Sequence, residues 1–366
     1  MKLLFTQDAL ASGGAERSHL EILSRFSETV EVVFVYFYPK HDLKEEYLKA
    51  GIRLIFLDIP ETYHFPTAIA RLVKLIKSEQ PDLLISSLWR ADQITRIASL
   101  LTRVPTVGTL VNDSYAPAAW NDKVGFRHKV VYYLDRATAR IPVHWIANAQ
   151  AIAYSHVQNL GLDFSKISVV YRGREVSNLA WKPNGGIRHF LSYGRLLERK
   201  GFQDLIRAFA RLDYLLPQGW SLTIFGDGPY RMELETLVRS SGLDGKVIFP
   251  GSIEKASELL PRYDCFLFPS WYEGFSGALV EAMMAGIPII ASNIPMNREA
   301  LGEDSGLLFP PLDVDQIVEQ VVYATTHLPE MTMLGRNARN RAIEFFSIDR
   351  ISATYEEKLH QIKNNL

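Results

Sequence analysis

The stretch EGFSGALVE, Glu273–Glu281, follows a short apolar strand, Cys265–Ser270, and leads into the helix-forming run Ala278–Ala285. Its small residues predict a helix that begins at Ser276 or Gly277. A helix N-terminus presents free backbone N–H groups and the positive end of the helix dipole, and both favour a phosphate. The stretch therefore predicts an anion site directly after a strand.

Two carboxylates flank this helix start. Glu273 precedes the turn, and Glu281 lies one turn inside the helix. Ionised carboxylates accept hydrogen bonds from hydroxyl groups. A ligand with a hydroxyl-bearing group on each side of a diphosphate, such as a nucleotide sugar, matches this arrangement. The amides expected to hold the diphosphate are those of Phe275, Ser276, Gly277, Ala278 and Leu279.

Strand and helix patterns alternate along most of the chain, which favours parallel sheets covered by helices on both faces. The 366 residues fit two domains, and the segment WKPNGGI, Trp181–Ile187, has the composition of a linker. We therefore expect an α/β protein with two doubly wound, Rossmann-like domains that face a central cleft. The expected strands are Lys2–Thr6, Glu31–Tyr38, Ile52–Leu57, Leu83–Leu88, Thr106–Val111, Trp145–Asn148 and Ile167–Arg172, then His189–Tyr193, Ser221–Phe225, Val247–Pro250, Cys265–Pro269, Pro288–Ser292 and Leu307–Phe309.

The composition is ordinary for a soluble globular protein, with 47% apolar and 22% charged residues. The net charge of −1 excludes a globally basic nucleic-acid-binding protein. Cys265 is the only cysteine, so no intramolecular disulfide can form, and we expect it to be a small buried side chain. The start MKLLFTQDAL lacks a secretory apolar region, and no run approaches the about 18 apolar residues of a membrane span. We expect a cytoplasmic protein.

Four segments carry a resemblance to a known family. They are YGRLLERKGFQDLIRAF from Tyr193, IFGDGP from Ile224, the E-x₇-E spacing of Glu273–Glu281, and AMMAGIPIIAS from Ala282. Together they resemble the donor-binding half of the retaining glycosyltransferases of family 4, the group of glycogen synthase and phosphatidylinositol mannosyltransferase. Their order and distances fit over residues 189–311.

The resemblance implies the GT-B fold. Residues 1–180 would form the acceptor-binding domain and residues 187–345 the nucleotide-sugar-binding domain, while the helix within 346–366 would cross back to the first domain. It also implies a hexosyltransferase that is metal-independent and retaining. Such an enzyme moves a hexose from a nucleoside-diphosphate sugar to a glycan or a lipid-linked acceptor, as in polysaccharide or lipopolysaccharide biosynthesis.

The implied mechanism needs no cofactor besides the donor substrate. The leaving phosphate deprotonates the acceptor on the same face of the sugar. Glu273 would orient the sugar and Glu281 would bind the ribose. Three alternatives stay open: a catalytically weak partner subunit that binds a nucleotide sugar, a nucleotide-sugar epimerase, and a phosphorylase with a Lys-bound pyridoxal cofactor.

Two basic residues follow the strand His189–Tyr193. Arg195 ends the segment HFLSYGR, and Lys200 lies in the turn before the expected helix Gly201–Phe209. Residues at these positions in the family contact the donor diphosphate, where fixed cations stabilise the charge that develops on the leaving group. We therefore assign Arg195 and Lys200, with Glu273, to catalysis. The alternative is a solvated charged turn.

A glycine pair follows the first strand. In SGGAER, Gly13 and Gly14 precede the expected helix Ala15–Phe26, so backbone can approach a ligand closely there. Family members have a glycine loop at this position that meets the donor. A tight strand-to-helix turn without a ligand is the alternative.

The acceptor site departs from the family pattern. Many members carry a His after the fourth strand and another after the fifth, where this chain has Ser86, Ser87 and Val111. The nearest polar substitutes are Asn112 and Asp113. Aromatic and cationic side chains suit a sugar or an anion, so the acceptor candidates are Trp89, Arg90, Asn112 and Asp113. Packing between the domains would explain the same residues.

Asp313 and Asp315 form a D-x-D pattern that some glycosyltransferases of another fold use to hold a metal. Asp313 follows PPL and precedes an apolar-periodic helix, so a helix N-cap with a second acid in the first turn is the simpler interpretation. We expect no metal site.

Peripheral membrane contact is a further expectation for a lipid-linked acceptor. The helix-forming segment Phe126–Arg140 interleaves basic and apolar residues, as does Ala68–Lys77. Either could lie on the inner face of an anionic membrane or pack against the sheet as a core helix. The nucleotide base, the sugar, the linkage and the oligomeric state cannot be read from these residues.

Overall fold

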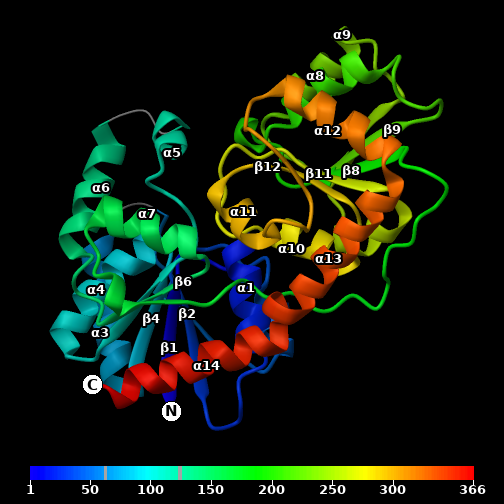
Figure 1. The fold of residues 1–366 in the computed structure, drawn as a ribbon. Coiled ribbons are helices and arrows are strands. Elements are labelled where there is room, and N and C mark those ends of the chain that lie inside the picture. Colours follow the sequence, from blue (N-terminus) through cyan, green and yellow to red (C-terminus); the bar gives the residue numbers. More distant parts are fainter. Residues whose placement is uncertain (62–63, 123–125) are drawn as a thin grey trace. The chain divides into compact units, whose positions relative to one another are not determined.

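The computed structural model describes residues 1–61, 64–122 and 126–366. The chain divides into two compact units. Met1–Gly173 and Ile348–Leu366 form the first, and Arg174–Ser347 forms the second. Each unit contains one parallel sheet with helices packed on it (Figure 1). Within the described ranges, no helix has both the length and the apolarity to cross a membrane.

The first sheet has the strand order β3-β2-β1-β4-β5-β6-β7 and is parallel throughout. Because the order reverses between β1 and β4, the carboxyl ends of these two strands mark the switch point where such sheets bind ligands. The strands are β1 (Lys2–Gln7), β2 (Glu31–Tyr36), β3 (Arg53–Phe56), β4 (Leu83–Ser87), β5 (Thr106–Leu110), β6 (His144–Ala147) and β7 (Ile167–Val169).

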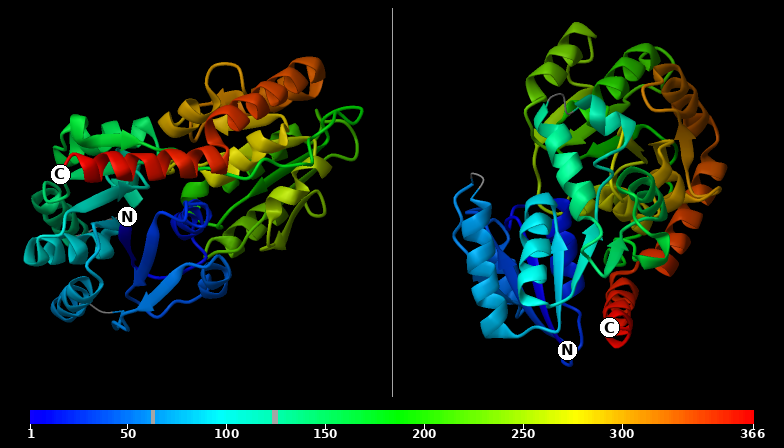
Figure 2. Two further views of the ribbon diagram at one scale, coloured as in Figure 1. Left: turned by 90° about the horizontal axis from the view of Figure 1, so that it is seen from below. Right: turned by 90° about the vertical axis from the view of Figure 1, so that its left-hand side faces the viewer.

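Successive side chains of these strands are buried on opposite faces of the sheet. In β1, Phe5 packs into a cluster with α1 and α14, and Leu4 packs into another with α3 and α4. Helix α14 thus belongs to the first unit and lies along it in both views of Figure 2. The helices of this unit are α1 (Gly14–Leu23), α2 (Lys44–Lys49), α3 (Phe65–Glu79), α4 (Trp89–Thr102), α5 (Pro117–Asp122), α6 (Phe126–Thr138), α7 (Gln150–Leu160), the 3₁₀ turn η1 (Phe164–Lys166) and α14 (Ile348–Asn364).

The second sheet has the order β10-β9-β8-β11-β12-β13 and is also parallel. Its switch point lies between β8 and β11. The strands are β8 (His189–Tyr193), β9 (Ser221–Phe225), β10 (Val247–Gly251), β11 (Cys265–Phe268), β12 (Ile289–Ser292) and β13 (Leu307–Phe309). The helices are η2 (Glu198–Lys200), α8 (Phe202–Leu212), α9 (Arg231–Ser240), η3 (Ala256–Arg262), α10 (Gly277–Ala285), α11 (Pro295–Leu301), α12 (Val314–Thr326) and α13 (Leu328–Phe346).

The strands expected from the sequence are confirmed in both sheets, with ends that differ by a few residues. Cys265 is fully buried, as expected. The linker expected at Trp181–Ile187 is wrong, because this segment lies inside the second unit. Trp181 is buried there, and its indole N–H donates to the carbonyl oxygen of Tyr263 at 2.8 Å. A Gly- and Pro-rich turn within a domain has the same composition as a linker, so composition could not separate them.

Candidate functional site

Helix α10 starts where the sequence predicted. Ser276 is its N-cap, and the Ser276 hydroxyl accepts a hydrogen bond from the Leu279 N–H at 3.5 Å. Since this bond uses the Leu279 amide, that amide is less suited to a ligand than the sequence implied. Phe275 is fully buried and packs edge-on against Phe346, with ring centroids 5.1 Å apart. Its side chain therefore anchors the loop and leaves only its backbone for a ligand.

Lys200 and Glu273 are brought into direct contact at the switch point of the second sheet. The Lys200 ammonium group donates to Glu273 Oε1, and the two side chains are only 15% and 12% exposed. Lys200 lies in η2 after β8, and Glu273 lies in the loop after β11. The sequence predicted that both serve one site. It did not predict that they form a largely buried ion pair.

This ion pair determines the charge of Glu273. Burial raises the pKa of Glu273. The charge and hydrogen bond of Lys200, and then the charge of Arg199 and a hydrogen bond from Ser270, together lower it by more than burial raises it. The net pKa lies below the ordinary value for Glu. Glu273 is therefore an ionised acceptor at neutral pH, able to take hydrogen bonds from hydroxyl groups.

Glu281 has two partners that the sequence did not reveal. Arg174 Nε donates to Glu281 Oε1 at 2.6 Å, and the Tyr193 hydroxyl donates to Oε2 at 2.8 Å. Glu281 is therefore not a surface carboxylate without a partner. Burial, and next the charge of Glu281, raise the pKa of Tyr193 well above its ordinary value, so Tyr193 remains a donor.

Arg174 also lies against the start of α10. A Cβ added to Gly277 would come closer than 3.0 Å to Arg174 Nη2, so the guanidinium would have to move away. Because Gly277 has no side chain, the Arg174 guanidinium can lie against the helix N-terminus. A planar guanidinium also suits a phosphate. The available sequence signal was the segment Arg172-Gly173-Arg174, which places two arginines directly after an expected strand.

Arg195 follows β8, as the sequence predicted, and its side chain is exposed. It forms no ion pair with any part of the chain that the structure describes. The neighbouring Arg199 instead lies over the Tyr272 ring, 5.0 Å from its centroid. Arg195 is therefore a cation at the carboxyl end of β8 that no carboxylate of these residues neutralises.

In the first unit the glycine loop begins α1. Gly13 is the N-cap and Gly14 is the first helical residue. A Cβ on Gly13 would clash with the Glu16 carboxylate, and one on Gly14 would lie 3.2 Å from Arg172 Nη1. The glycines therefore allow an acid and a guanidinium to approach the helix start closely.

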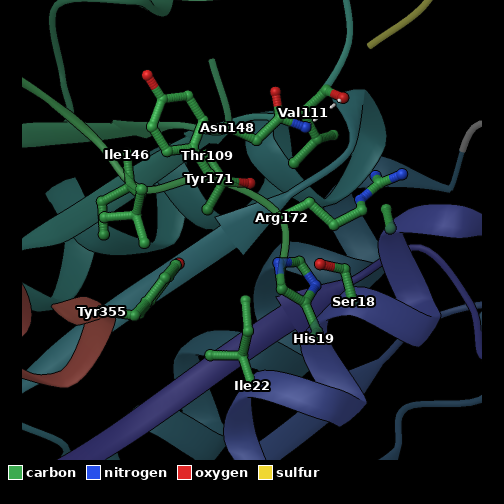
Figure 3. A pocket seen from close by; sticks show the side chains of 12 residues that line it. Ser18, His19, Ile22, Thr109, Val111, Ile146, Asn148, Tyr171, Arg172 and Tyr355 are labelled. Carbon is green, nitrogen blue, oxygen red and sulfur yellow. Dashed lines mark hydrogen bonds between the residues drawn. The ribbon is translucent and has the colours of Figure 1, made fainter. Parts of the chain in front are cut away.

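A small cavity of about 30 Å³ lies beside the start of α1. Figure 3 shows Ser18 and His19 entering it from α1 and Tyr355 from α14. Burial, with a smaller effect of the Arg172 charge, lowers the pKa of His19 to about 4, so its ring is neutral. The cavity has the volume of one water molecule, which is too small for a sugar.

The acceptor candidates are engaged within the first unit. Trp89 packs edge-on against Phe65 at 5.9 Å, and Arg90 lies 4.9 Å from the Tyr38 ring centroid. Asn112 accepts a hydrogen bond from Ser114, and Asp113 accepts one from Ser155 at 2.5 Å. Packing and local hydrogen bonds thus explain these four side chains, and their role toward an acceptor stays a prediction.

The sequence missed a half-buried carboxyl at the switch point of the first sheet. Asp8, directly after β1, accepts a hydrogen bond from the Ala91 N–H in the first turn of α4 at 2.7 Å. Burial raises the pKa of Asp8 to about 6, although this hydrogen bond and the charge of Arg90 oppose the rise. An Asp directly after a first strand was the available signal.

Asp313 is the N-cap of α12, as predicted, because its Oδ1 accepts from the Gln316 N–H at 3.0 Å. Asp315 pairs with Arg211. Within residues 1–61, 64–122 and 126–366, no three His, Cys, Asp or Glu side chains gather as metal ligands.

Two family models match successive halves of the chain. Residues 12–178 match the family described as Glycosyltransferase Family 4, and residues 179–341 match Glycosyl transferases group 1. The recognised resemblance is therefore confirmed.

Curated relatives include two enzymes of similar length. One is the N-acetylgalactosamine-N,N'-diacetylbacillosaminyl-diphospho-undecaprenol 4-alpha-N-acetylgalactosaminyltransferase of Campylobacter jejuni, 25% identical over 312 residues, with 82% of this chain and 83% of the relative covered. The other is the UDP-Gal:alpha-D-GlcNAc-diphosphoundecaprenol alpha-1,3-galactosyltransferase of Escherichia coli, 25% identical over 299 residues, with 77% and 76% covered.

Solved structures share the fold. HepE of Anabaena in complex with UDP has a TM-score of 0.83 and 22% identity, with 99% of this chain and 100% of that chain covered. Sucrose-phosphate synthase of Thermosynechococcus elongatus has a TM-score of 0.80 and 18% identity, with both chains fully covered. These likenesses confirm the expected GT-B fold.

Proposed function

This chain belongs to the glycosyltransferases of family 4, and from that premise we propose that it transfers a hexose with retention, and without a metal ion, from a nucleoside-diphosphate sugar to a lipid-linked acceptor. A glycan acceptor without a lipid is the second candidate. The proposal rests on the site at the start of α10.

The observation that supports it most is the pairing of each carboxylate of the site with a cation. Glu273 pairs with Lys200, and Glu281 pairs with Arg174, on two sides of one helix N-terminus. A diphosphate at that N-terminus would meet cations on both sides, and the hydroxyl groups attached to it would meet carboxylates. In this proposal Glu281 binds the ribose and Glu273 orients the hexose.

The proposed transfer takes place on one face of the sugar. The bond between the anomeric carbon and the β-phosphate oxygen breaks, and a bond from that carbon to the acceptor oxygen forms. The proton of the acceptor hydroxyl passes to the departing phosphate oxygen. The anomeric configuration is thereby retained without a covalent intermediate on the protein, and ionised Glu273 supports the positive charge that develops on the sugar.

Fixed cations supply the charge that a metal would otherwise bring to the diphosphate. Lys200 and Arg174 are held in place by their carboxylate partners, and Arg195 is exposed after β8. Preorganised charges of this kind stabilise a leaving group more in the transition state than in the ground state. This arrangement supports a metal-independent mechanism.

The names of relatives support a lipid-linked acceptor and a uridine diphosphate donor. The relatives from Campylobacter jejuni and Escherichia coli are named for diphospho-undecaprenol acceptors. HepE is described in complexes with UDP and UDP-glucose, and the E. coli enzyme is named for UDP-Gal. We therefore propose a uridine diphosphate donor and a membrane-bound acceptor, which places the enzyme at a membrane surface.

The test is calorimetric titration of UDP, GDP and ADP into the wild-type protein and the Glu281→Ala variant, with a chelator present. We expect one nucleotide to bind and the variant to lose that binding. A donor of the selected base is then offered with a diphosphate-linked polyprenol sugar, and proton NMR compares the anomeric configuration of donor and product.

Each outcome of this test has a clear meaning. An inverted product would refute retention, and turnover abolished by the chelator would refute metal independence. Binding without turnover would favour the partner-subunit alternative, for which the absent family His residues give a reason. An altered nucleotide sugar released without acceptor would indicate the epimerase. Failure of all three nucleotides to bind would refute the site at α10.

A further inference from the structure

Helix α6 (Phe126–Thr138) exposes four large apolar side chains. Phe126 is 81% exposed, Tyr133 65%, Leu134 46% and Val130 39%. Their spacing of four, three and one residues puts them on one stripe of the helix surface. An amphipathic helix of a globular protein normally turns such residues inward, so this stripe requires an explanation.

Basic residues flank the stripe. Arg127, Lys129 and Arg136 lie on the helix, Arg140 lies two residues beyond its end, and all four are exposed. None of the four forms an ion pair with a carboxylate of the residues that the structure describes. Arg127 lies on one side of the stripe, and Lys129 and Arg136 lie on the opposite side, as the helical period of 3.6 residues requires. The outward face is therefore apolar along its centre and cationic along both edges.

The inward face holds the helix in this orientation. Asp135, the only acidic residue within 126–140, is buried and accepts hydrogen bonds from Arg96 at 2.5 Å and from the Tyr115 hydroxyl at 2.6 Å. The Tyr132 hydroxyl donates to the carbonyl oxygen of Asn159 at 2.8 Å. These contacts tie α6 to its own unit and leave the apolar stripe facing outward.

Helix α3 (Phe65–Glu79), the second basic segment noted in the sequence, behaves differently. Its apolar residues Ala68, Leu72 and Ile76 are buried in the core, and Arg71 donates to the carbonyl oxygens of Leu57 and Asp58. The exposed Lys74 and Lys77 have no apolar stripe between them. The core-helix interpretation fits α3 and fails for α6.

We propose that the outward face of α6 binds the surface of an anionic lipid bilayer. Phe126, Val130, Tyr133 and Leu134 would enter the boundary between headgroups and acyl chains, and the basic residues at its edges would contact lipid phosphates. Charge complementarity favours this occupant, because the face carries four cations and no carboxylate. The inference deepens the proposed function by naming the face that meets the membrane, and its evidence depends on neither donor nor acceptor.

The experiment is flotation of the full chain with vesicles of phosphatidylcholine alone and with vesicles that also contain phosphatidylglycerol. We expect binding only to the anionic vesicles, weakened by salt. F126S/Y133S should abolish flotation. K129E/R140E should weaken it by at least about fivefold for each charge changed.

Two matched variants serve as controls. K74E/K77E makes the same charge change on α3, and Y214S/L215S removes two exposed apolar side chains, 95% and 67% exposed, from the second unit. Both should float like the wild type. Unchanged circular dichroism and nucleotide binding show that each variant is folded and separate this test from the proposed donor site.

Three results would overturn the proposal. The first is that the wild type does not float with anionic vesicles. The second is that the control variants lose flotation as much as the α6 variants do. The third is that the wild type self-associates in sedimentation velocity, and that F126S/Y133S abolishes this association but still binds lipid. The last result would assign the face to a second copy of the chain.

Discussion

The guanidinium of Arg174 touches helix α10 at two points one turn apart: its Nε donates to Glu281 at 2.6 Å, and its Nη2 fills the space beside Gly277. Glu281, the proposed ribose-binding carboxylate, and the helix N-terminus are thus coupled through one side chain. This coupling has consequences that mutation can measure.

Gly277→Ala should weaken nucleotide binding by at least about tenfold, because the new Cβ would displace the Arg174 guanidinium. Alanine normally favours a helix over glycine, and the flexible end of Arg174 can move away from the new Cβ, so the free energy of unfolding should change by less than about 1 kcal/mol. Calorimetric titration with the selected nucleotide and thermal unfolding measure the two effects. In an Arg174→Ala background, Gly277→Ala should have no further effect on binding. A full additional loss there would show that Arg174 is not the cause.

Arg174→Lys should weaken nucleotide binding by about tenfold, although the charge is kept. An ammonium cannot reproduce the fork that holds Glu281 and faces the helix start. Tyr193→Phe removes a hydrogen bond from an uncharged hydroxyl to Glu281, and a longer one to the Ala278 carbonyl oxygen, but leaves the Arg174 ion pair, so it should cost about fivefold or less. Calorimetric titration of both variants with nucleotide shows whether Arg174 or Tyr193 contributes more to binding through Glu281. If Arg174→Lys binds as tightly as the wild type, the guanidinium has no role in donor binding.

Lys200→Gln should move the acid limb of the pH profile of kcat/KM upward. In the folded wild type the Lys200 charge helps to lower the pKa of Glu273. Ionised Glu273 therefore stabilises the fold above the unfolded pKa, and this stabilisation is lost as pH falls through the folded pKa. Without Lys200, burial dominates and the pKa of Glu273 rises.

The same substitution leaves a buried carboxylate unpaired and should cost about 3 kcal/mol of stability at pH 7. The control is Glu273→Gln/Lys200→Gln, which removes both charges and should regain most of the stability without regaining activity. Equal unfolding temperatures of the single and double variants would show that the ion pair is energetically negligible.

Asp92→Asn should reduce the stability that the protein loses between pH 5 and pH 8. Burial raises the pKa of Asp92 to about 7, with Arg96 opposing the rise. This pKa is above the value in the unfolded chain. The contribution of Asp92 to the free energy of unfolding is therefore fully present below the unfolded pKa and is lost as pH rises to about 7. We expect the wild type to lose about 3 kcal/mol across this window through Asp92.

Urea unfolding at pH 5 and pH 8 tests this expectation. Arg96 keeps its bond to Asp135 in the variant, so the comparison does not create an unpaired cation. The exposed Asp244→Asn serves as the control and should follow the wild type at both pH values. A steeper pH dependence in Asp92→Asn would contradict the raised pKa.

Much of the fold could be predicted from local patterns. Strands such as β1 and β11 are continuous apolar runs ended by turn residues, and strands covered on both faces leave that signature in any sequence. The start of α10 at Ser276 and the cap at Asp313 were equally readable, because a cap bonds within three residues of itself. The supposed linker at Trp181–Ile187 failed because flexible composition is also typical of turns inside a domain.

The sequence by itself determined the parallel α/β architecture, the helix start that suits a phosphate, and the presence of Glu273, Glu281, Arg195 and Lys200 near it. Only the tertiary structure decided the partners: Lys200 meets Glu273 across 73 residues of chain, and Arg174 meets Glu281 across 107. The outward stripe of α6 was also undecided, since the same periodic residues could have packed inward. The physical reason is that caps and strand patterns depend on neighbours in sequence, whereas ion pairs and exposed faces depend on where the sheet brings distant segments together.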